Sequence, residues 1–199
     1  MRILAYALIL LTCLSFTHRE TVLVHRFIVQ PSSKITINGR TNINSFQCAT
    51  ARYNGKDTLV LVEGNRRKPF FEKGFVGLEA ASFDCGMQVM THDFSKTIKA
   101  REYPSISIEL ISFERIPVYT STDKFRGKMK ISLAGVTKTF LLDCSIEPKE
   151  TGTFHLRGNK NFKFADFGLE APQKAMGLIK VDDNLLVDFH LVLQLDTNL

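Results

Sequence analysis

The chain of 199 residues contains no tryptophan, four cysteines and six prolines, and its longest apolar run is short. A transmembrane helix needs about 20 consecutive apolar residues, whereas the longest run here, residues 3–11, has nine. Four cysteines are too few for a disulfide-dense miniprotein, and a hydrophobic share of 44% is too high for a disordered chain. The composition therefore predicts a single domain with its own hydrophobic core.

The charge balance does not indicate a nucleic-acid-binding protein. Lys and Arg number 26 against 20 Asp and Glu, a formal net charge of +6. The basic runs at residues 66–68 and 160–163 are short and lie among turn residues, whereas a nucleic-acid site needs clustered Lys and Arg with stacking aromatics. A solvated surface is the preferred interpretation of these charges.

The N-terminus has the pattern of a secretory signal: Arg2, the apolar run, and then small and polar residues. We expect residues 1–17 to be a signal peptide, residues 18–32 an N-terminal segment and residues 33–199 one domain. This predicts a periplasmic or secreted bacterial protein. Leu10-Leu11-Thr12-Cys13 also resembles a bacterial lipobox, so a lipid anchor at Cys13 is an alternative.

From residue 33 onward, apolar residues recur at every second position, the period of a strand with one buried face. The alternating segments are 34–38, 58–61, 105–110, 128–133, 140–142 and 187–195. Short turn signals between them indicate antiparallel neighbours, because a loop of two or three residues cannot return a parallel strand.

These turn signals occur at four places. Asn54-Gly55 predicts a hairpin between 47–53 and 56–62, and Ala134-Gly135 predicts one between 129–133 and 136–142. Residues 182–184 separate 178–181 from 185–195. Asn38-Gly39 fits either a hairpin or a bulge within one long strand.

A single helix is expected, with Asp93 as its N-cap and Phe94, Ile98 and Arg101 on one face, ending before Tyr103-Pro104. Exposed loops are expected at 118–124 and 147–154. The predicted fold class is all-β: a closed or nearly closed antiparallel barrel of about eight strands with one short helix, because closure removes exposed strand edges.

Three blocks in order resemble the YceI-like family. The first is Phe83-Asp84-Cys85, Thr91-His92-Asp93-Phe94 and Tyr103-Pro104-Ser105-Ile106. The second joins Gly127-Lys128-Met129-Lys130-Ile131 to Ala134-Gly135-Val136-Thr137-Lys138, and the third is Ala165-Asp166-Phe167-Gly168-Leu169. The resemblance implies a lipocalin-like barrel that holds a long isoprenoid chain, such as a polyprenyl quinone or polyprenyl alcohol.

Sixteen Phe without Trp provide apolar surface that carries no N–H group. On the residues alone, a core filled by its own side chains is the preferred interpretation, whereas the resemblance favours an open interior. The expected interior residues are Ile35, Ile37, Phe46, Phe75, Leu78, Phe83, Ile108, Ile131, Phe140, Leu142, Phe164, Phe189, Leu191 and Leu193. Candidates for a head-group contact at the mouth are His92, Asp93 and Lys99, although Asp93 also fits a plain helix cap and Lys99 a solvated residue.

Cys48, Cys85 and Cys144 share the inward phase of their segments. In an oxidising compartment a Cys48–Cys85 disulfide is the preferred pairing, and three separate thiols stay open as an alternative. Neither the cysteines nor the histidines have the short paired spacing of a zinc site, so no metal or other cofactor is expected.

Catalysis is not expected, because the histidines are scattered and no nucleophile elbow or phosphate-binding glycine loop occurs. The preferred function is an exported protein that carries or sequesters an isoprenoid or other long-chain lipid. The alternative is a filled barrel that acts as a cell-envelope interaction or stress-response module. The sequence leaves homodimer formation open.

Overall fold

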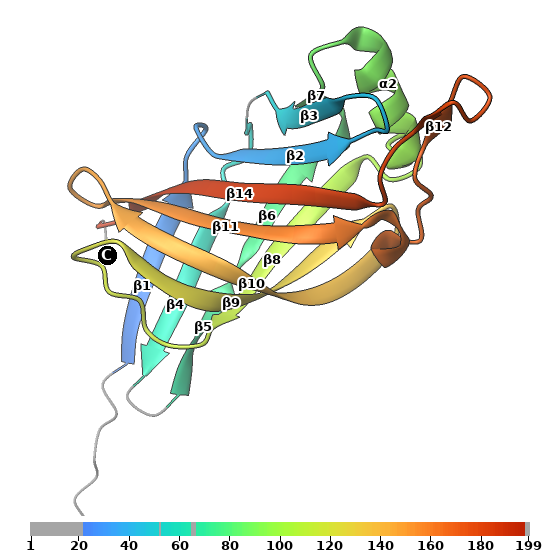
Figure 1. The fold of residues 1–199 in the computed structure, drawn as a ribbon. Coiled ribbons are helices and arrows are strands. Elements are labelled where there is room, and N and C mark those ends of the chain that lie inside the picture. Colours follow the sequence, from blue (N-terminus) through green and yellow to red (C-terminus); the bar gives the residue numbers. More distant parts are fainter. Residues whose placement is uncertain (1–21, 52, 65–66, 198–199) are drawn as a thin grey trace, which may run out of the picture.

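Eight antiparallel strands close into a barrel in the computed structural model, which describes residues 22–51, 53–64 and 67–197 (Figure 1). The expected signal peptide and Cys13 lie outside these residues. In barrel order the strands are β1 (Val22–Val29), β4 (Thr58–Gly64), β5 (Arg67–Lys73), β8 (Ser105–Phe113), β9 (Asp123–Leu133), β10 (Val136–Pro148), β11 (Thr153–Lys163) and β14 (Asn184–Leu195). Pairing of β14 with β1 closes the ring, so the predicted fold class is confirmed. None of the helices in the described part is long and apolar enough to span a membrane.

The barrel begins earlier than the boundary at residue 33 that the sequence suggested. β1 pairs with β4 from Val22 to Ile28 and with β14 from Phe27 to Val29. Phe27 and Val29 are buried in the core. The segment 18–32 is therefore not a separate N-terminal element, because its described residues supply one of the eight barrel strands.

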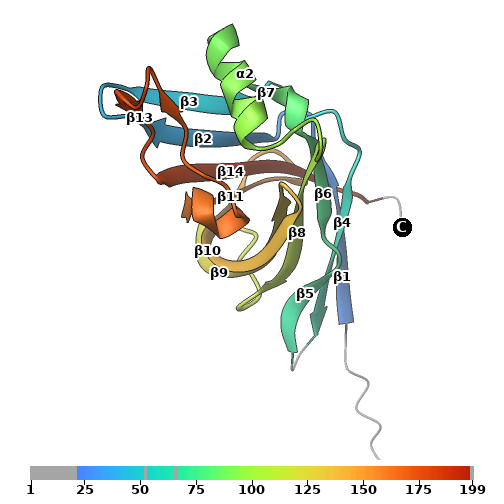
Figure 2. The ribbon, with the colours of Figure 1, turned by 90° about the vertical axis from the view of Figure 1, so that its right-hand side faces the viewer.

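One end of the barrel is extended by further strands. β1 and β2 (Lys34–Arg40) pair with successive stretches of the same edge of β14, and β3 (Ser45–Thr50) and β7 (Phe83–Asp84) follow β2 outward. On the opposite side β6 (Phe75–Glu79) continues the line of β5 along β8. The chain bends between β5 and β6 at Gly74, where a Cβ would lie 2.0 Å from the Leu110 carbonyl oxygen. Figure 2 shows the resulting flare of β2 and β3 away from β1 and β4.

The 3-10 helix η2 (Ala80–Ser82), β7 and the helix α2 (Gln88–Thr97) lie at this flared end (Figure 1, Figure 2). The expected N-cap Asp93 is wrong, because the helix begins after Met87 and Asp93 lies within it. The helix also ends at Thr97, since Lys99 adopts a left-handed φ of 54°. The sequence pattern missed the first turn because Thr91 fixes it through tertiary contacts: its hydroxyl accepts from the Cys85 N–H and donates to Asp84.

The Ala134-Gly135 hairpin is confirmed, with left-handed φ values of 50° and 79° between β9 and β10. The Asn54-Gly55 hairpin is wrong, because β3 pairs with β2 and β7 whereas β4 pairs with β1 and β5. Residues 53–57 precede β4 and are anchored by Tyr53, whose hydroxyl donates to Asp57 at 2.5 Å.

Of the two alternatives for Asn38-Gly39, the hairpin is wrong and the position within a strand is observed, although without a bulge: both residues lie inside β2 in continuous register with β3, and the β2–β3 turn follows at residues 41–44. The segment before 182–184 does not pair with β14, since β13 (Ile179–Lys180) pairs with β12 (Gln173–Lys174) to form a separate hairpin. The expected loop 118–124 lies instead at 114–122, because β8 ends at Phe113 and β9 begins at Asp123. The expected loop 147–154 shortens to 149–152, because the pairing of β10 with β11 extends to Pro148 and Phe154.

Candidate functional site

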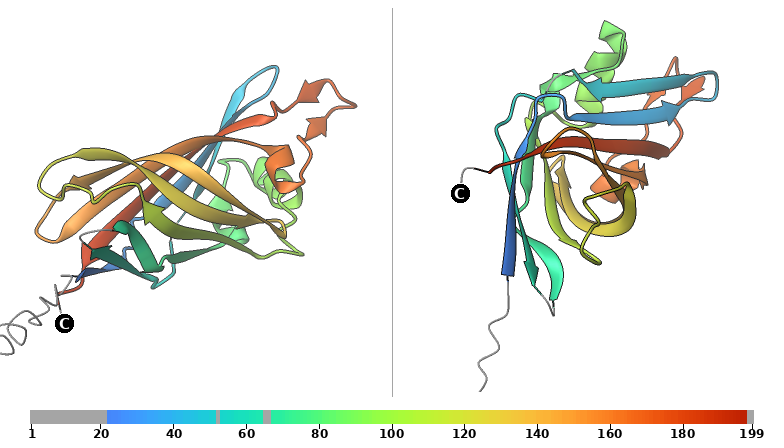
Figure 3. Two further views of the ribbon diagram at one scale, coloured as in Figure 1. Left: turned by 90° about the horizontal axis from the view of Figure 1, so that it is seen from below. Right: turned by 90° about the vertical axis from the view of Figure 1, so that its left-hand side faces the viewer.

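A cavity of about 320 Å³ opens at the flared end of the barrel. Its walls are inward residues of β2, β3, β6, β8, β9, β11 and β14, together with the 3-10 helix η3 (Phe164–Phe167). Its mouth lies between the β2–β3 turn, α2 and the β12–β13 hairpin. Figure 3 shows these three segments gathered at one end of the molecule, away from the C-terminus.

Strand pairing explains why the inward residues converge. Ile35 and Ile37 lie opposite Phe189 and Val187 across the β2–β14 pair, and Ile108 lies opposite Ile131 across the β8–β9 pair. Nine of the expected interior residues line the cavity: Ile35, Ile37, Phe46, Leu78, Phe83, Ile108, Ile131, Phe164 and Phe189.

Phe75 was expected inside but is 50% exposed, because Val76 and Leu78 take the inward positions of the short strand β6. Phe140 does not line the cavity and packs edge-on against Phe162, with ring centroids 4.9 Å apart. The expectation that these two phenylalanines line the cavity is therefore wrong. The periodicity of one strand cannot show where its barrel neighbours bend.

The other half of the barrel is filled. The interior residues Leu142, Leu191 and Leu193 are buried in that half and do not line the cavity, contrary to expectation. A void among Leu110, Met129 and their neighbours measures about 20 Å³, roughly the space of a single water molecule. The filled core and the open interior, the two alternatives of the sequence analysis, are thus each found in one half of the barrel: the core toward β1 and the cavity toward α2.

At the mouth, the structure places only one of the three predicted head-group residues in the lining. Asp93 lines the cavity and its Oδ1 accepts from Lys174 Nζ at 2.7 Å, whereas His92 and Lys99 lie outside the lining and are exposed. Lys99 instead terminates α2.

Lys163 and Lys174 also line the mouth, and sequence reasoning missed both. Lys174 belongs to a strand of two residues, too short to produce a periodic signal. Its partner Asp93 is 81 positions away, so only the folded chain brings the two together.

A disulfide holds the base of the mouth. Cys48 of β3, which lines the cavity, is joined to Cys85, directly before α2, with Cα atoms 4.0 Å apart. This is the preferred pairing of the sequence analysis, and it decides against the alternative of three separate thiols. Cys144 is a free, buried thiol in the filled half, and burial raises its pKa to about 11. Its thiol is therefore a packing group and not a nucleophile.

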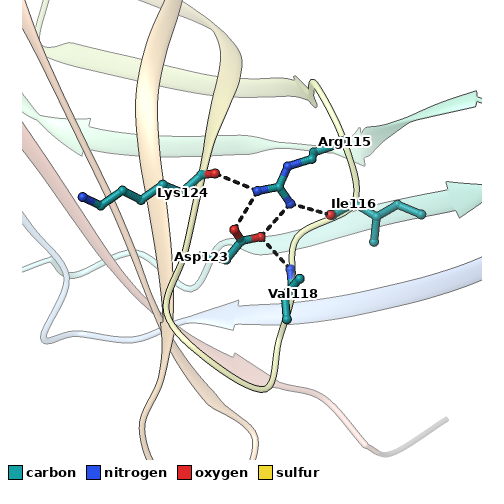
Figure 4. A network of polar contacts seen from close by, with 5 residues as sticks. All are labelled: Arg115, Ile116, Val118, Asp123 and Lys124. Carbon is teal, nitrogen blue, oxygen red and sulfur yellow. Dashed lines mark hydrogen bonds and ion pairs between the residues drawn. The ribbon is translucent and has the colours of Figure 1, made fainter.

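Polar contacts fix the loop 114–122 at the end of the barrel opposite the cavity. The Arg115 guanidinium donates to both oxygens of Asp123 at 2.7 and 2.6 Å, and the Val118 N–H donates to the same carboxylate (Figure 4). These hydrogen bonds hold the pKa of Asp123 well below its usual range.

In the same loop, Tyr119 donates to buried Glu63 at 2.8 Å, and His25 Nε2 lies 3.4 Å from the other carboxylate oxygen. Burial favours protonation of Glu63, but these contacts outweigh it and lower its pKa. The loop is therefore anchored to β4 by a buried carboxylate.

Two histidines that are far apart in the sequence meet on the outward phase of β11 and β14. His155 Nδ1 lies 3.2 Å from His190 Nε2. Burial and the nearby Arg157 lower the pKa of His190 to about 4 and also lower that of His155. Neither side chain lines the cavity, and the described residues contain no group of three His, Cys, Asp or Glu side chains arranged to hold a metal ion.

Comparisons with known proteins agree with this geometry. The family model of the YceI-like domain matches residues 28–193. A structure described as a polyisoprenoid binding domain from Saccharophagus degradans superposes with a TM-score of 0.61 at 10% identity, covering 85% of this chain and 98% of that chain. The crystal structure of Burkholderia cenocepacia BcnA gives a TM-score of 0.56 at 15% identity, covering 80% of this chain and 95% of that chain. A sequence search of curated proteins finds no match.

Proposed function

The chain belongs to the YceI-like domain family, and on that premise we propose that it carries or sequesters an isoprenoid-type lipid by enclosing the hydrocarbon chain in the barrel cavity. The observation that carries this proposal is the distribution of polarity in the lining. The polar lining residues belong to the segments around the mouth: Thr41, Asn44, Asp93, Thr97, Lys163 and Lys174. Below them the walls are aliphatic and aromatic.

Such a cavity binds a hydrocarbon without specific polar contacts. Each Å² of apolar surface removed from water contributes roughly 25 cal/mol, so affinity grows with the length of chain enclosed. The mouth residues then orient the polar end of the lipid. The Lys163 ammonium and the Asp93–Lys174 pair supply both donors and an acceptor at that position.

The class of ligand is supported by the resemblance to the Saccharophagus degradans structure, described as polyisoprenoid binding. The cavity volume, about 320 Å³, lies near the lower end of the range of roughly 300–1,000 Å³ for small-molecule sites. Because the polar lining residues lie at the mouth, we propose that the tail of the chain enters first and that the polar end stays at the mouth.

We further propose that the protein is exported to the periplasm or the medium. Arg2 and the apolar run 3–11 support a signal peptide, and the Cys48–Cys85 disulfide is typical of an oxidising compartment. Cell fractionation of the full chain and of a chain that lacks residues 2–17 tests this location. Retention of both forms in the cytoplasm would contradict export.

Extraction of the purified protein with organic solvent, followed by mass spectrometry, tests the ligand. We expect a lipid with an isoprenoid chain, in amounts comparable to the protein. Protein that releases no such lipid and also fails to bind an added polyprenyl alcohol would refute the proposal.

A further inference from the structure

Large apolar side chains are exposed around the mouth of the cavity. Ile43 in the β2–β3 turn is 66% exposed, and Met87 and Val89 at the start of α2 are 57% and 75% exposed. In the β12–β13 hairpin, Met176 is fully exposed and Leu178 is 73% exposed. We call the three segments that carry them, residues 40–45, 87–97 and 173–180, the mouth rim.

The hairpin of the mouth rim presents its apolar residues in a costly conformation. Ala175, Met176 and Gly177 all have left-handed φ values, 51°, 55° and 86°, although only glycine adopts this region readily. Backbone hydrogen bonds close the turn, from the Gly177 N–H to the Lys174 carbonyl and from the Leu178 N–H to the Ala175 carbonyl, both at 3.1 Å, but the Met176 side chain is fully exposed. Strain of this kind in a water-exposed apolar tip points to a binding role.

The hairpin is also held in a fixed place. The Asn42 amide donates to the Leu178 carbonyl at 2.8 Å and accepts from the Lys180 N–H at 2.9 Å. The apolar tip and Ile43 therefore keep a constant spacing across the mouth.

The charge of the mouth rim identifies a complementary surface. Its fully charged residues are four bases, Arg40, Lys96, Lys174 and Lys180, against the single acid Asp93. Apolar tips surrounded by basic side chains match the interface of a bilayer that contains anionic lipids, where the tips enter the acyl boundary and the bases meet the head groups.

We propose that the mouth rim docks on the surface of an anionic membrane, so that the cavity opens directly onto the bilayer. This inference rests on the proposed function, because the docked mouth lets a lipid chain move between the bilayer and the cavity without crossing water. A long chain would otherwise expose its whole apolar surface during transfer.

Co-sedimentation with vesicles tests the docking. We expect the protein to bind phosphatidylcholine vesicles that contain phosphatidylglycerol, and to bind less as salt is added. The double variant Met176→Asp with Leu178→Asp should lose at least about tenfold in vesicle affinity. Both side chains are exposed, and aspartate tolerates the left-handed region, so the variant should fold.

The control is Leu141→Asp, at an apolar residue that is also exposed, on the outer face of β10, and this variant should leave vesicle binding unchanged. Lys180→Gln should weaken binding about fivefold, and Lys128→Gln on β9 should not. Equal losses for rim and control variants would overturn the proposal. So would a wild-type protein that ignores vesicles, whether it stays monomeric, dimerises through the mouth rim or captures a protein partner there.

A second assay separates this inference from the proposed function. Binding of a polyprenyl alcohol dispersed in detergent reports on the cavity alone, and the rim double variant should retain it. Vesicle binding without polyprenol binding would support docking while refuting the lipid-carrier function. Polyprenol binding without vesicle binding would support the lipid-carrier function and refute docking of the mouth rim on the membrane.

Discussion

Replacing Val187 with Trp should close the cavity while leaving the barrel intact. Val187 lies on β14 opposite Ile37, and both line the cavity. An indole ring that buries about 150 Å² of apolar surface would displace a comparable area of ligand. At roughly 25 cal/mol per Å² the loss is about 4 kcal/mol, close to a thousandfold in affinity.

The stability of the Val187→Trp variant should change little, because the ring enters existing space. Overpacking a filled core typically costs about 1–3 kcal/mol. The matched control is Leu186→Trp on the same strand, since Leu186 is 39% exposed and does not line the cavity. Titration with a detergent-dispersed polyprenyl alcohol, alongside thermal unfolding, measures both effects. Tight binding by Val187→Trp, or equal losses in both variants, would show that the ligand does not occupy this cavity.

Three further predictions concern stability. The double variant Cys48→Ser with Cys85→Ser removes a cross-link between residues 37 positions apart. It should lower the free energy of unfolding by about 2–4 kcal/mol, which corresponds to a fall in Tm of about 5–15 °C. An unchanged Tm would contradict the presence of this disulfide at the mouth. Tyr119→Phe removes the hydrogen bond to buried Glu63 and should cost about 1–3 kcal/mol in a urea titration, whereas a neutral effect would mean that the loop does not depend on this bond. Burial lowers the pKa of His190 from its ordinary 6.5 to about 4 in the folded chain. Between these two pH values the unfolded chain binds a proton that the folded chain does not, so the free energy of unfolding falls as the pH decreases. His190→Gln should therefore reduce the dependence of Tm on pH in this interval, and an unchanged dependence would show that another group causes it.

The sequence predicted the cavity walls because alternation alone decides which face of a regular strand points inward. Ile35, Ile37, Ile108 and Ile131 all sit in such runs, and each lines the cavity. The same rule failed for Phe75, because β6 is five residues long and takes its phase from β8 across the bend at Gly74.

Turn signals were reliable only where the two flanking strands pair with each other. Ala134-Gly135 joins β9 to β10, which pair along their whole length. Asn54-Gly55 lies between β3 and β4, which have different partners. A local turn motif shows that the chain can reverse its direction there, but the strand order of the closed barrel decides which strand the next one pairs with.

How far the cavity extends could not be predicted, because it depends on side-chain volumes that meet across the barrel. Gly127 and Gly158 occupy inward positions that would leave a passage, but the Cys144 sulfur fills the space between them, 3.1 and 3.4 Å from where their Cβ atoms would lie. Ile108 and Phe189 line both the large cavity and the small void beyond it, so these two side chains form the partition. The barrel backbone thus sets the width available to a lipid chain, while Ile108 and Phe189 set the depth to which it can enter.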